Sequence, residues 1–183
     1  LDSRYEEAIQ LIDSYLPKSK DVTVLSLKKA EVLIHLGKLE EAESLLKKTE
    51  ESITREKNPP YYKALVAMNY GSLYQHEGRN DLAIEQFQEA ISLLEEDKRS
   101  ANLEMADALA YLGNVFRSTG SYVQAEEQLQ RSLSIRQAKL PETHELIAAS
   151  YNDLGLVYTQ LDVDKAFDYY EKALAIYKKL HGQ

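Results

Sequence analysis

The amino-acid sequence predicts an all-α protein built as a solenoid of antiparallel helix pairs. Three short segments carry this prediction because they repeat one pattern: Tyr70–Tyr74, Leu112–Phe116 and Leu154–Tyr158, each with glycine at its second position. The segments begin 42 residues apart both times, since 112 − 70 and 154 − 112 are both 42. Self-similarity at a fixed period of this size is typical of one supersecondary unit that stacks on copies of itself.

Each repeat predicts a helix, a turn and a second helix. The turn is marked in the first two copies by Gly78 and Gly120. The second helix shows a recurring series of a small, a bulky and another small residue at Ala83, Phe87 and Ala90, at Ala125, Leu129 and Ser132, and at Ala166, Tyr170 and Ala173. Small and apolar residues spaced three and four apart describe one face of a helix.

The glycines inside the first helices indicate a close helix crossing. Gly71, Gly113 and Gly155 stand at the same register of the three copies. Glycine in a helix interior costs about 1 kcal/mol relative to alanine. Its recurrence therefore implies that a larger side chain would push the two antiparallel helix axes apart.

This pattern resembles the tetratricopeptide repeat (TPR), whose usual period is about 34 residues. A weaker fourth copy lies upstream, at Ala30, Leu33, Gly37, Ala42 and Leu46, and a half copy opens the chain at Tyr5, Ala8, Ile12 and Leu16. The longer period of the later copies predicts about one extra turn in each helix. The long repeats resemble those of the kinesin light chain, and residues 139–148 resemble the linker between repeats in that family. The proline expected directly after His144 in that linker is absent here. The resemblance implies a right-handed superhelix.

The repeats predict one domain over residues 1–183, with a half repeat at 1–20 and full repeats at 21–58, 59–98, 99–140 and 141–183. The chain begins in what reads as a second helix and ends in what resembles another linker, so we expect a fragment of a longer protein. The predicted final helix, Val163–Leu180, is apolar without a polar cap. Because repeat arrays need polar terminal surfaces, self-association through uncapped ends is a further expectation.

Composition narrows the classes of partner. Lys and Arg number 22 and Asp and Glu 30, giving a formal net charge of −8 without a basic cluster, which argues against nucleic acid. Cysteine is absent, so disulfides and cysteine metal sites are excluded. The sequence contains no apolar run long enough for a membrane span and no leader. We expect a cytoplasmic protein without a membrane partner.

The resemblance implies a concave groove lined by the first helices, with the candidate peptide-binding residues on it. These are Met68, Asn69, Ser72, Gln75, Tyr111, Asn114, Arg117, Asn152 and Leu156. Asparagine offers both a donor and an acceptor, so Asn69, Asn114 and Asn152 suit the backbone of an extended peptide. The alternative is that each asparagine is simply solvated.

The charged and aromatic residues of the predicted groove indicate which kind of ligand to expect. Some family members grip a terminal carboxylate with groove lysines, but here Arg117 is the only groove cation near Asn114. Because Glu31, Asp107 and Asp153 also face the predicted groove, we expect a neutral or mildly basic segment. Most of the 13 tyrosines match packing positions of the repeat, whereas Tyr111 neighbours the groove, where its ring would anchor a ligand.

No enzyme signature is present. The four histidines, His35, His76, His144 and His181, lack a metal-binding helix spacing, and neither a phosphate-binding glycine loop nor a nucleophile elbow occurs. His35 and His76 stand at equivalent places beside turn glycines, which favours a structural or ligand-lining role. We therefore expect no catalysis, cofactor or metal.

The leading hypothesis is a scaffold or adaptor that binds a peptide segment or helix of a partner protein in the groove. The alternative is a regulatory sensor, in which a bound signalling peptide changes the superhelix and so controls an attached effector domain. A third reading is self-assembly through the uncapped ends.

Overall fold

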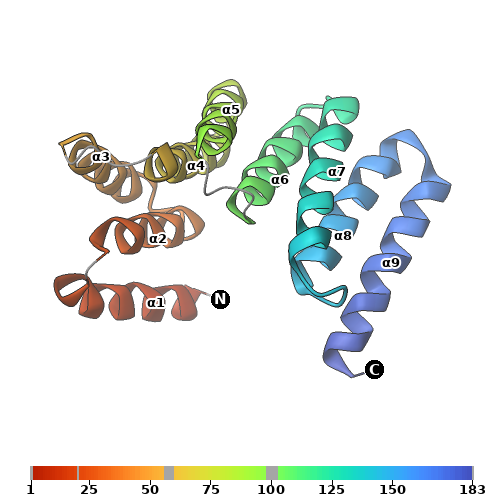
Figure 1. Ribbon diagram of the computed structural model, residues 1–183, viewed down its shortest axis with the longest axis horizontal. Helices are drawn as coiled ribbons and strands as arrows, with labels where there is room; N and C mark the ends of the chain where they lie inside the picture. Colours follow the sequence, from red (N-terminus) through yellow and green to blue (C-terminus); the bar gives the residue numbers. More distant parts are fainter. Residues whose placement is uncertain (1, 20, 56–59, 98–102, 183) are drawn as a thin grey trace. The chain divides into compact units, whose positions relative to one another are not determined.

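The computed structural model describes residues 2–19, 21–55, 60–97 and 103–182, and every element within these ranges is helical (Figure 1). The helices are α1 (Asp2–Tyr15), the short 3₁₀ helix η1 (Leu16–Lys18), α2 (Val22–His35), α3 (Leu39–Arg55), α4 (Pro60–His76), α5 (Asn80–Glu96), α6 (Leu103–Ser118), α7 (Tyr122–Lys139), α8 (Glu145–Leu161) and α9 (Val163–His181). The predicted all-α class is confirmed.

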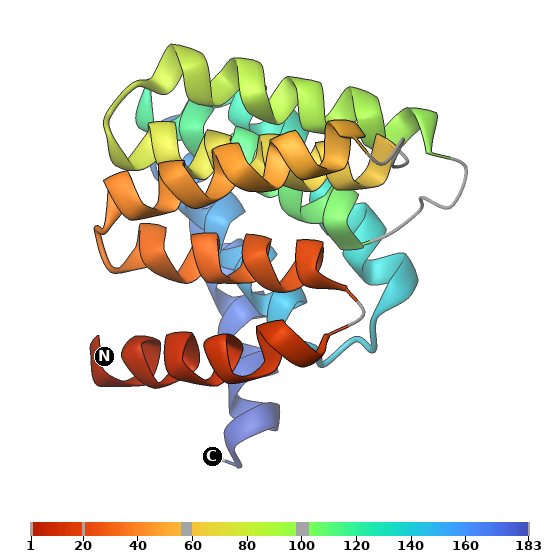
Figure 2. The same ribbon diagram turned by 90° about the vertical axis from the view of Figure 1, so that its left-hand side faces the viewer.

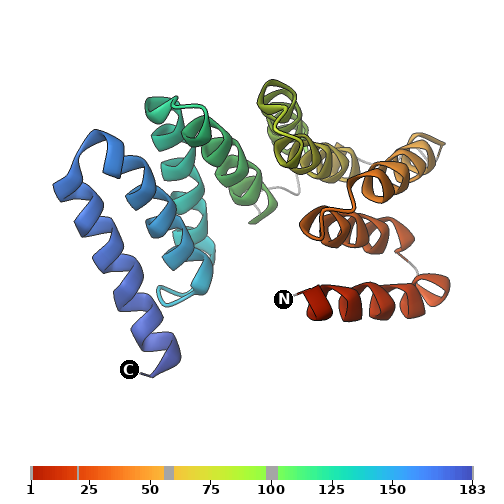
Figure 3. The same cartoon turned by 180° about the vertical axis from the view of Figure 1, so that it is seen from behind.

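The helices pack in sequential pairs, α2 on α3, α4 on α5, α6 on α7 and α8 on α9. Each pair lies within the bounds of one predicted repeat, and α1 and η1 lie within residues 1–20, the predicted half repeat. Contacts divide the chain into unit 1, residues 1–98, and unit 2, residues 99–183. Figure 2 shows the helices of unit 1 from the left-hand side of Figure 1, with α1 at the bottom, and Figure 3 shows the helices of unit 2 following one another from α6 to α9.

The first helices of the later repeats are longer than α2, but no helix gains the full extra turn that the sequence predicts for each, and α5 has the same length as α3. Helices α2 and α3 have 14 and 17 residues, whereas α8 and α9 have 17 and 19. At about 1.5 Å per residue, this difference adds more than one turn to the last pair.

Three helix pairs share one type of turn. Gly37, Gly78 and Gly120 adopt φ angles of 71°, 74° and 80°, the left-handed region that glycine enters at little cost. The residue after each glycine donates its N–H back to the carbonyl five residues earlier, at 2.8–2.9 Å, as in a Schellman cap. These bonds satisfy carbonyl groups at the ends of α2, α4 and α6.

The turn between α8 and α9 is built differently. Only Asp162 separates the two helices, and its backbone is extended, with φ −162°. Its carboxylate accepts hydrogen bonds from the N–H groups of Asp164 and Lys165, which caps α9. This one-residue turn accounts for the step from Tyr158 to Ala166, which is one residue shorter than the step from Phe116 to Ala125.

The predicted close crossings are confirmed at all three glycines. A Cβ atom on Gly71 would lie 2.7 Å from the ring of Phe87, and one on Gly155 would lie 2.6 Å from the ring of Tyr170. A Cβ on Gly113 would lie 2.7 Å from Leu129. Each bulky residue of the second helix therefore occupies the space that a side chain on the first helix would need.

Each unit has its own hydrophobic core, and the small residues of the repeat lie in it. Ala83, Ala90 and Ala125 are fully buried, as is Ser132, whose hydroxyl donates to the carbonyl of Ala106 at 2.6 Å. In the part of the chain that the structure describes, no helix has the length and apolar character that a membrane crossing requires.

Candidate protein-binding surface

The predicted binding residues come from the first helices of the repeats: α4 in unit 1, and α6 and α8 in unit 2. The 42-residue period makes many of them equivalent. Ser72, Asn114 and Leu156 share one register, and Asn69 shares another with Tyr111 and Asp153. The same register can therefore be compared between helices.

In unit 1 the polar members of the set bond to their own helix. The Asn69 Nδ2 donates to the carbonyl of Leu65 at 2.9 Å, and the Ser72 hydroxyl donates to the carbonyl of Met68 at 3.1 Å. Met68 itself is buried, with 8% of its surface exposed, and Gln75 is half-buried. The α4 residues thus offer a ligand few uncommitted polar groups.

In unit 2, Asn114 instead connects two helices. Its Oδ1 accepts from Nε of Arg117, one turn along α6, at 3.3 Å. Its side chain also lies within hydrogen-bonding reach of Asp153 on α8, where it lowers the pKa of that carboxyl group. The amide is therefore held on both sides in one orientation.

The carboxyl group of Asp153 lies in a mixed environment. Burial raises its pKa above the usual 3.8, while the hydrogen bond with Asn114 and the positive charges of Arg136 and Arg117 oppose the rise. Burial dominates, so the charged carboxylate is only partly compensated by its neighbours.

Arg136, which the sequence analysis did not single out, links three helices from a buried position on α7. Its Nη2 donates to Oδ1 of Asp107 on α6 at 2.7 Å, and its Nη1 donates to the hydroxyl of Ser150 on α8 at 2.7 Å. A longer bond of 3.4 Å reaches the carbonyl of Leu146. The Arg136 side chain is only 6% exposed. Its Nε is buried without a partner among the described residues.

We call this set the α6–α8 network, consisting of Asp107, Asn114, Arg117, Arg136, Ser150 and Asp153. A sequence signal for it exists in the register of Arg136. The equivalent positions of α5 and α9 hold Leu94 and Tyr177, so a charged residue replaces a packing residue in this repeat alone. With two carboxylates and two guanidinium groups, the network balances its own charge.

The remaining candidates of unit 2 lie at the surface beside the network. Tyr111 is 36% exposed, and Asn152 is also exposed, whereas Leu156 is half-buried. An aromatic, an amide and an aliphatic side chain therefore accompany the α6–α8 network on the same two helices.

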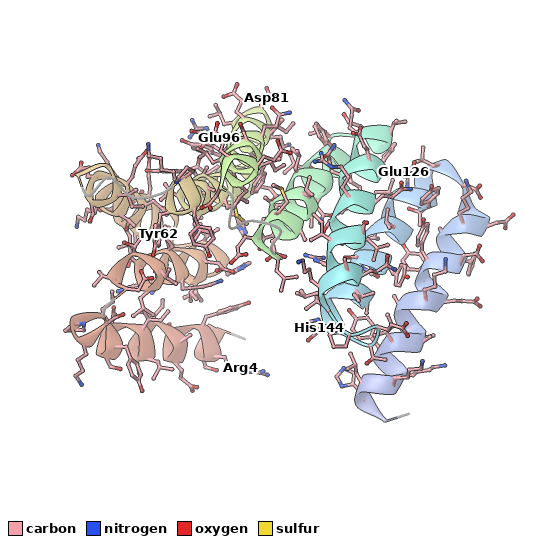
Figure 4. All side chains as sticks on the ribbon, viewed as in Figure 1. Arg4, Tyr62, Asp81, Glu96, Glu126 and His144 are labelled. Atoms are coloured by element: carbon pink, nitrogen blue, oxygen red, sulfur yellow. The ribbon has the colours of Figure 1, made fainter. Side chains whose placement is uncertain are left out.

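A second polar link joins α7 to α8 away from the network. The hydroxyl of Tyr158 donates to Glu126, a residue of α7 labelled in Figure 4. This hydrogen bond, with burial, raises the pKa of Tyr158 well above its usual value. Tyr158 also stacks on Tyr169 of α9, with ring centroids 5.2 Å apart, which supports its predicted packing role.

His144 has a structural role that the sequence did not reveal. It is the N-cap of α8, and its Nδ1 accepts from the N–H of Leu146 at 3.1 Å. The residue stands at the beginning of α8, where Figure 4 labels it. His144 thus satisfies one of the free N–H groups at the helix start.

The two histidines of unit 1 meet at the ends of α2 and α4. The rings of His35 and His76 lie edge to face with centroids 6.0 Å apart, and Tyr5 of α1 stacks on His35. Partial burial, followed by the charge of His35, lowers the pKa of His76. Within the described ranges, no group of three or more histidine and acidic side chains is placed to hold a metal ion.

Residues 21–96 and 104–179 both match the tetratricopeptide repeat family. The chain belongs to this family. Its repeats imply a protein–protein interaction scaffold, and proteins with this fold are typically non-catalytic. The predicted family is thereby confirmed.

Solved structures support the same fold at low sequence identity. BtubC (BKLC) from P. vanneervenii superposes with a TM-score of 0.80 at 22% identity, over 98% of this chain and 73% of that one. A Podosopora anserina kinesin light chain-like protein with nearly identical repeats gives 0.67 at 18% identity, over 99% and 90%. A Pyrococcus horikoshii STAND protein with a tetratricopeptide repeat sensor gives 0.72 at 22%, over 94% and 27%.

A curated relative matches part of the sequence. Protein NASP homolog 1 of Caenorhabditis elegans is 36% identical over 91 residues, which is 49% of this chain. The match spans 23% of the length of that relative. The likeness therefore extends over about half of this chain and less than a quarter of that relative.

Proposed function

We propose that this chain is an adaptor that binds a peptide segment of a partner protein on the first-helix face of unit 2. The observation that carries the proposal is the fixed amide of Asn114, held between Arg117 and Asp153. A polar group that is already oriented loses little entropy when a ligand binds. A cytoplasmic location is part of the proposal.

The proposed ligand contact is to main-chain groups of the peptide. An asparagine side chain has two N–H donors and an acceptor oxygen with two lone pairs. Among the described residues, the carboxylate of Asp153 uses one N–H of Asn114, and Nε of Arg117 uses one lone pair of its oxygen. One N–H and one lone pair remain, which match the carbonyl and N–H of an extended backbone.

The charge balance of the α6–α8 network favours a neutral or mildly basic segment. Asp107 is paired with Arg136, and Asp153 lies near Arg136 and Arg117, so neither carboxylate presents an isolated charge. Tyr111, 36% exposed beside the network, supplies a ring on which an apolar side chain of the peptide can pack.

The test is selection of binders from a displayed library of random peptides with the purified protein as bait. We expect enriched peptides to bind the wild type and to lose at least tenfold in affinity for Asn114→Ala/Arg117→Glu. The matched control is Gln130→Ala/Arg131→Glu on α7, which makes the same chemical changes on a second helix. Equal binding to both double variants and the wild type would refute the proposed surface, provided that circular dichroism shows all three to be folded.

A regulatory sensor is the second candidate function, and the likeness to the repeat sensor of the Pyrococcus horikoshii protein favours it. A sensor changes shape on binding, whereas a passive adaptor does not. Small-angle scattering with and without a selected peptide distinguishes the two. Coincident profiles would exclude the sensor and leave the adaptor standing.

A further inference from the structure

Helix α9 exposes an apolar stripe along one face. Val163, Phe167 and Leu174 are 59%, 65% and 51% exposed. With Tyr170, whose ring packs toward Gly155, they stand at intervals of four, three and four residues, which places them on one side of the helix. We call Val163, Phe167, Tyr170 and Leu174 the α9 stripe.

The equivalent face of α7 is covered. Leu133, which shares the register of Leu174, is only 9% exposed because α8 packs on α7. The residue equivalent to Phe167 is Glu126, which accepts a hydrogen bond from Tyr158 of α8. The residues of the α9 stripe are therefore equivalent to those through which α7 contacts the next repeat, but on α9 they are exposed.

Charged residues along one edge of the stripe change sign from end to end. Asp164, Glu171 and Lys178 follow one another at seven-residue intervals, so they lie in line beside the stripe. The acidic residue stands near the beginning of α9 and the basic residue near its end, with Glu171 midway.

We propose that the occupant of the α9 stripe is the same helix of a second copy of this chain, packed antiparallel about a two-fold axis. A two-fold interface uses the same patch twice and is the commonest arrangement of soluble homo-oligomers. In this arrangement Phe167 packs near Leu174 of the partner subunit. Asp164 lies near Lys178 of the partner subunit, and the symmetry forms this pair twice.

Glu171 allows a separate test of the antiparallel arrangement because it lies midway between Asp164 and Lys178. The two-fold axis brings it near Glu171 of the partner subunit, and two like charges at short distance repel. Glu171→Gln should therefore strengthen association. Glu171 is exposed on α9, so this substitution removes the repulsion without altering the core.

The first experiment is sedimentation equilibrium over a wide range of protein concentration. We expect the mass to rise from that of the 20.9 kDa monomer to twice that value. Phe167→Glu/Leu174→Glu should remain monomeric at concentrations where the wild type dimerises. Val123→Glu replaces a side chain that is 71% exposed on α7, and it should dimerise as the wild type does.

The opposite end of the chain supplies a competing contact. Leu11 and Tyr15 of α1 are 60% and 58% exposed, so α9 of one copy could meet α1 of another in an open chain. Loss of association in Leu11→Glu would overturn the proposal, because the contact between two copies of α9 does not involve α1 and the open chain does. So would a wild-type mass that stays at the monomer value throughout.

Charge exchange tests the antiparallel direction. In Asp164→Lys alone, two pairs of positive charges face each other across the interface, and in Lys178→Asp alone, two pairs of negative charges do so. Each variant should dimerise more weakly than the wild type. An equimolar mixture should form a heterodimer in which both pairs are again opposite in charge. A mixture that associates no better than its components would refute the antiparallel arrangement.

Discussion

Units 1 and 2 use the same repeat framework but commit their polar residues differently. In α4 of unit 1, Asn69 and Ser72 bond to carbonyls of their own helix. In unit 2, Asn114 and Arg136 bond across helices and connect α6, α7 and α8. The register of a repeat therefore fixes where a side chain lies on its helix, whereas contacts with other helices determine whether that side chain is held in one orientation.

The largest expected effect comes from exchanging the residues at the register of Arg136. Leu94→Arg would bury a charge at a position with 0% exposure in α5. An uncompensated buried charge costs about 3–5 kcal/mol. The reverse change, Arg136→Leu, should cost about 1–2 kcal/mol, because Asp107 is 35% exposed and Ser150 keeps its bond to the carbonyl of Leu146.

Urea unfolding of both variants measures the difference. Arg136→Leu tests whether the network is needed for stability or only for the binding surface. If Arg136→Leu proved more destabilising than Leu94→Arg, the contrast between the two units would be wrong.

A smaller effect is expected at the helix crossings. Gly71→Val would force its side chain into the ring of Phe87, and overpacking of this kind costs about 1–3 kcal/mol. Gly113→Val would do the same against Leu129 in unit 2. Hydrogen exchange should accelerate in α4 and α5 for the first variant, and in α6 and α7 for the second.

The control for valine in a helix is Ser92→Val, at an exposed position of α5. It should leave hydrogen exchange close to that of the wild type. An equal acceleration in Ser92→Val and Gly71→Val would show that steric contact at the crossing is not the cause.

Substitution of Asn69 in unit 1 and of Asn114 in unit 2 gives a further comparison of the two units. Asn114→Ala removes a hydrogen bond to a largely buried carboxylate, so the free energy of unfolding should fall by about 1–2 kcal/mol. Asn69→Ala should cost less than about 1 kcal/mol, because the Oδ1 of Asn69 is buried without a partner among the described residues and its removal offsets the lost bond to Leu65. Chemical unfolding of both variants decides the order, and an equal loss would contradict it.

The smallest effect is a pH dependence carried by Asp153. Burial raises the pKa of this acid in the folded state above its unfolded value of 3.8, so the folded state binds the proton more tightly. Its contribution to stability is therefore present below that value and is lost as pH rises through the folded pKa. Asp153→Asn should remove this loss, which we expect to be under about 1 kcal/mol.

The measurement is urea unfolding of the wild type and of Asp153→Asn at several pH values between about 4 and 7. The variant should gain stability relative to the wild type as pH rises. A difference between the two proteins that stays constant over this range would show that Asp153 does not titrate in the expected direction.

Repetition explains how much of the fold the sequence predicts. Gly71, Gly113 and Gly155 recur at one register, and the structure places a bulky residue against each of them. The turn at Asp162 could not be predicted in this way, because it occurs once and replaces the glycine turn with a side-chain cap. A feature that recurs at a fixed register can be recognised in a single sequence, whereas a turn that occurs once cannot.

The α6–α8 network was only partly predictable for a related reason. Asn114, Arg117 and Asp153 follow from the position of the first helices, but Arg136 belongs to a second helix, and the resemblance places only the first helices on the groove. Its partners lie 29 residues before it and 14 residues after it in the sequence. Only the folded chain brings the three helices together.

The most direct test of the account is an NMR titration of the ¹⁵N-labelled protein with one peptide selected from the displayed library, following the side-chain amide signals of the asparagines. We expect the Asn114 and Asn152 signals to shift with peptide concentration while that of Asn69 stays in place, because the proposed oriented polar surface lies on unit 2. Shifts confined to Asn69, or to the backbone amides of α3, α5 and α7 in the same spectra, would contradict it and would place the binding surface elsewhere on the chain.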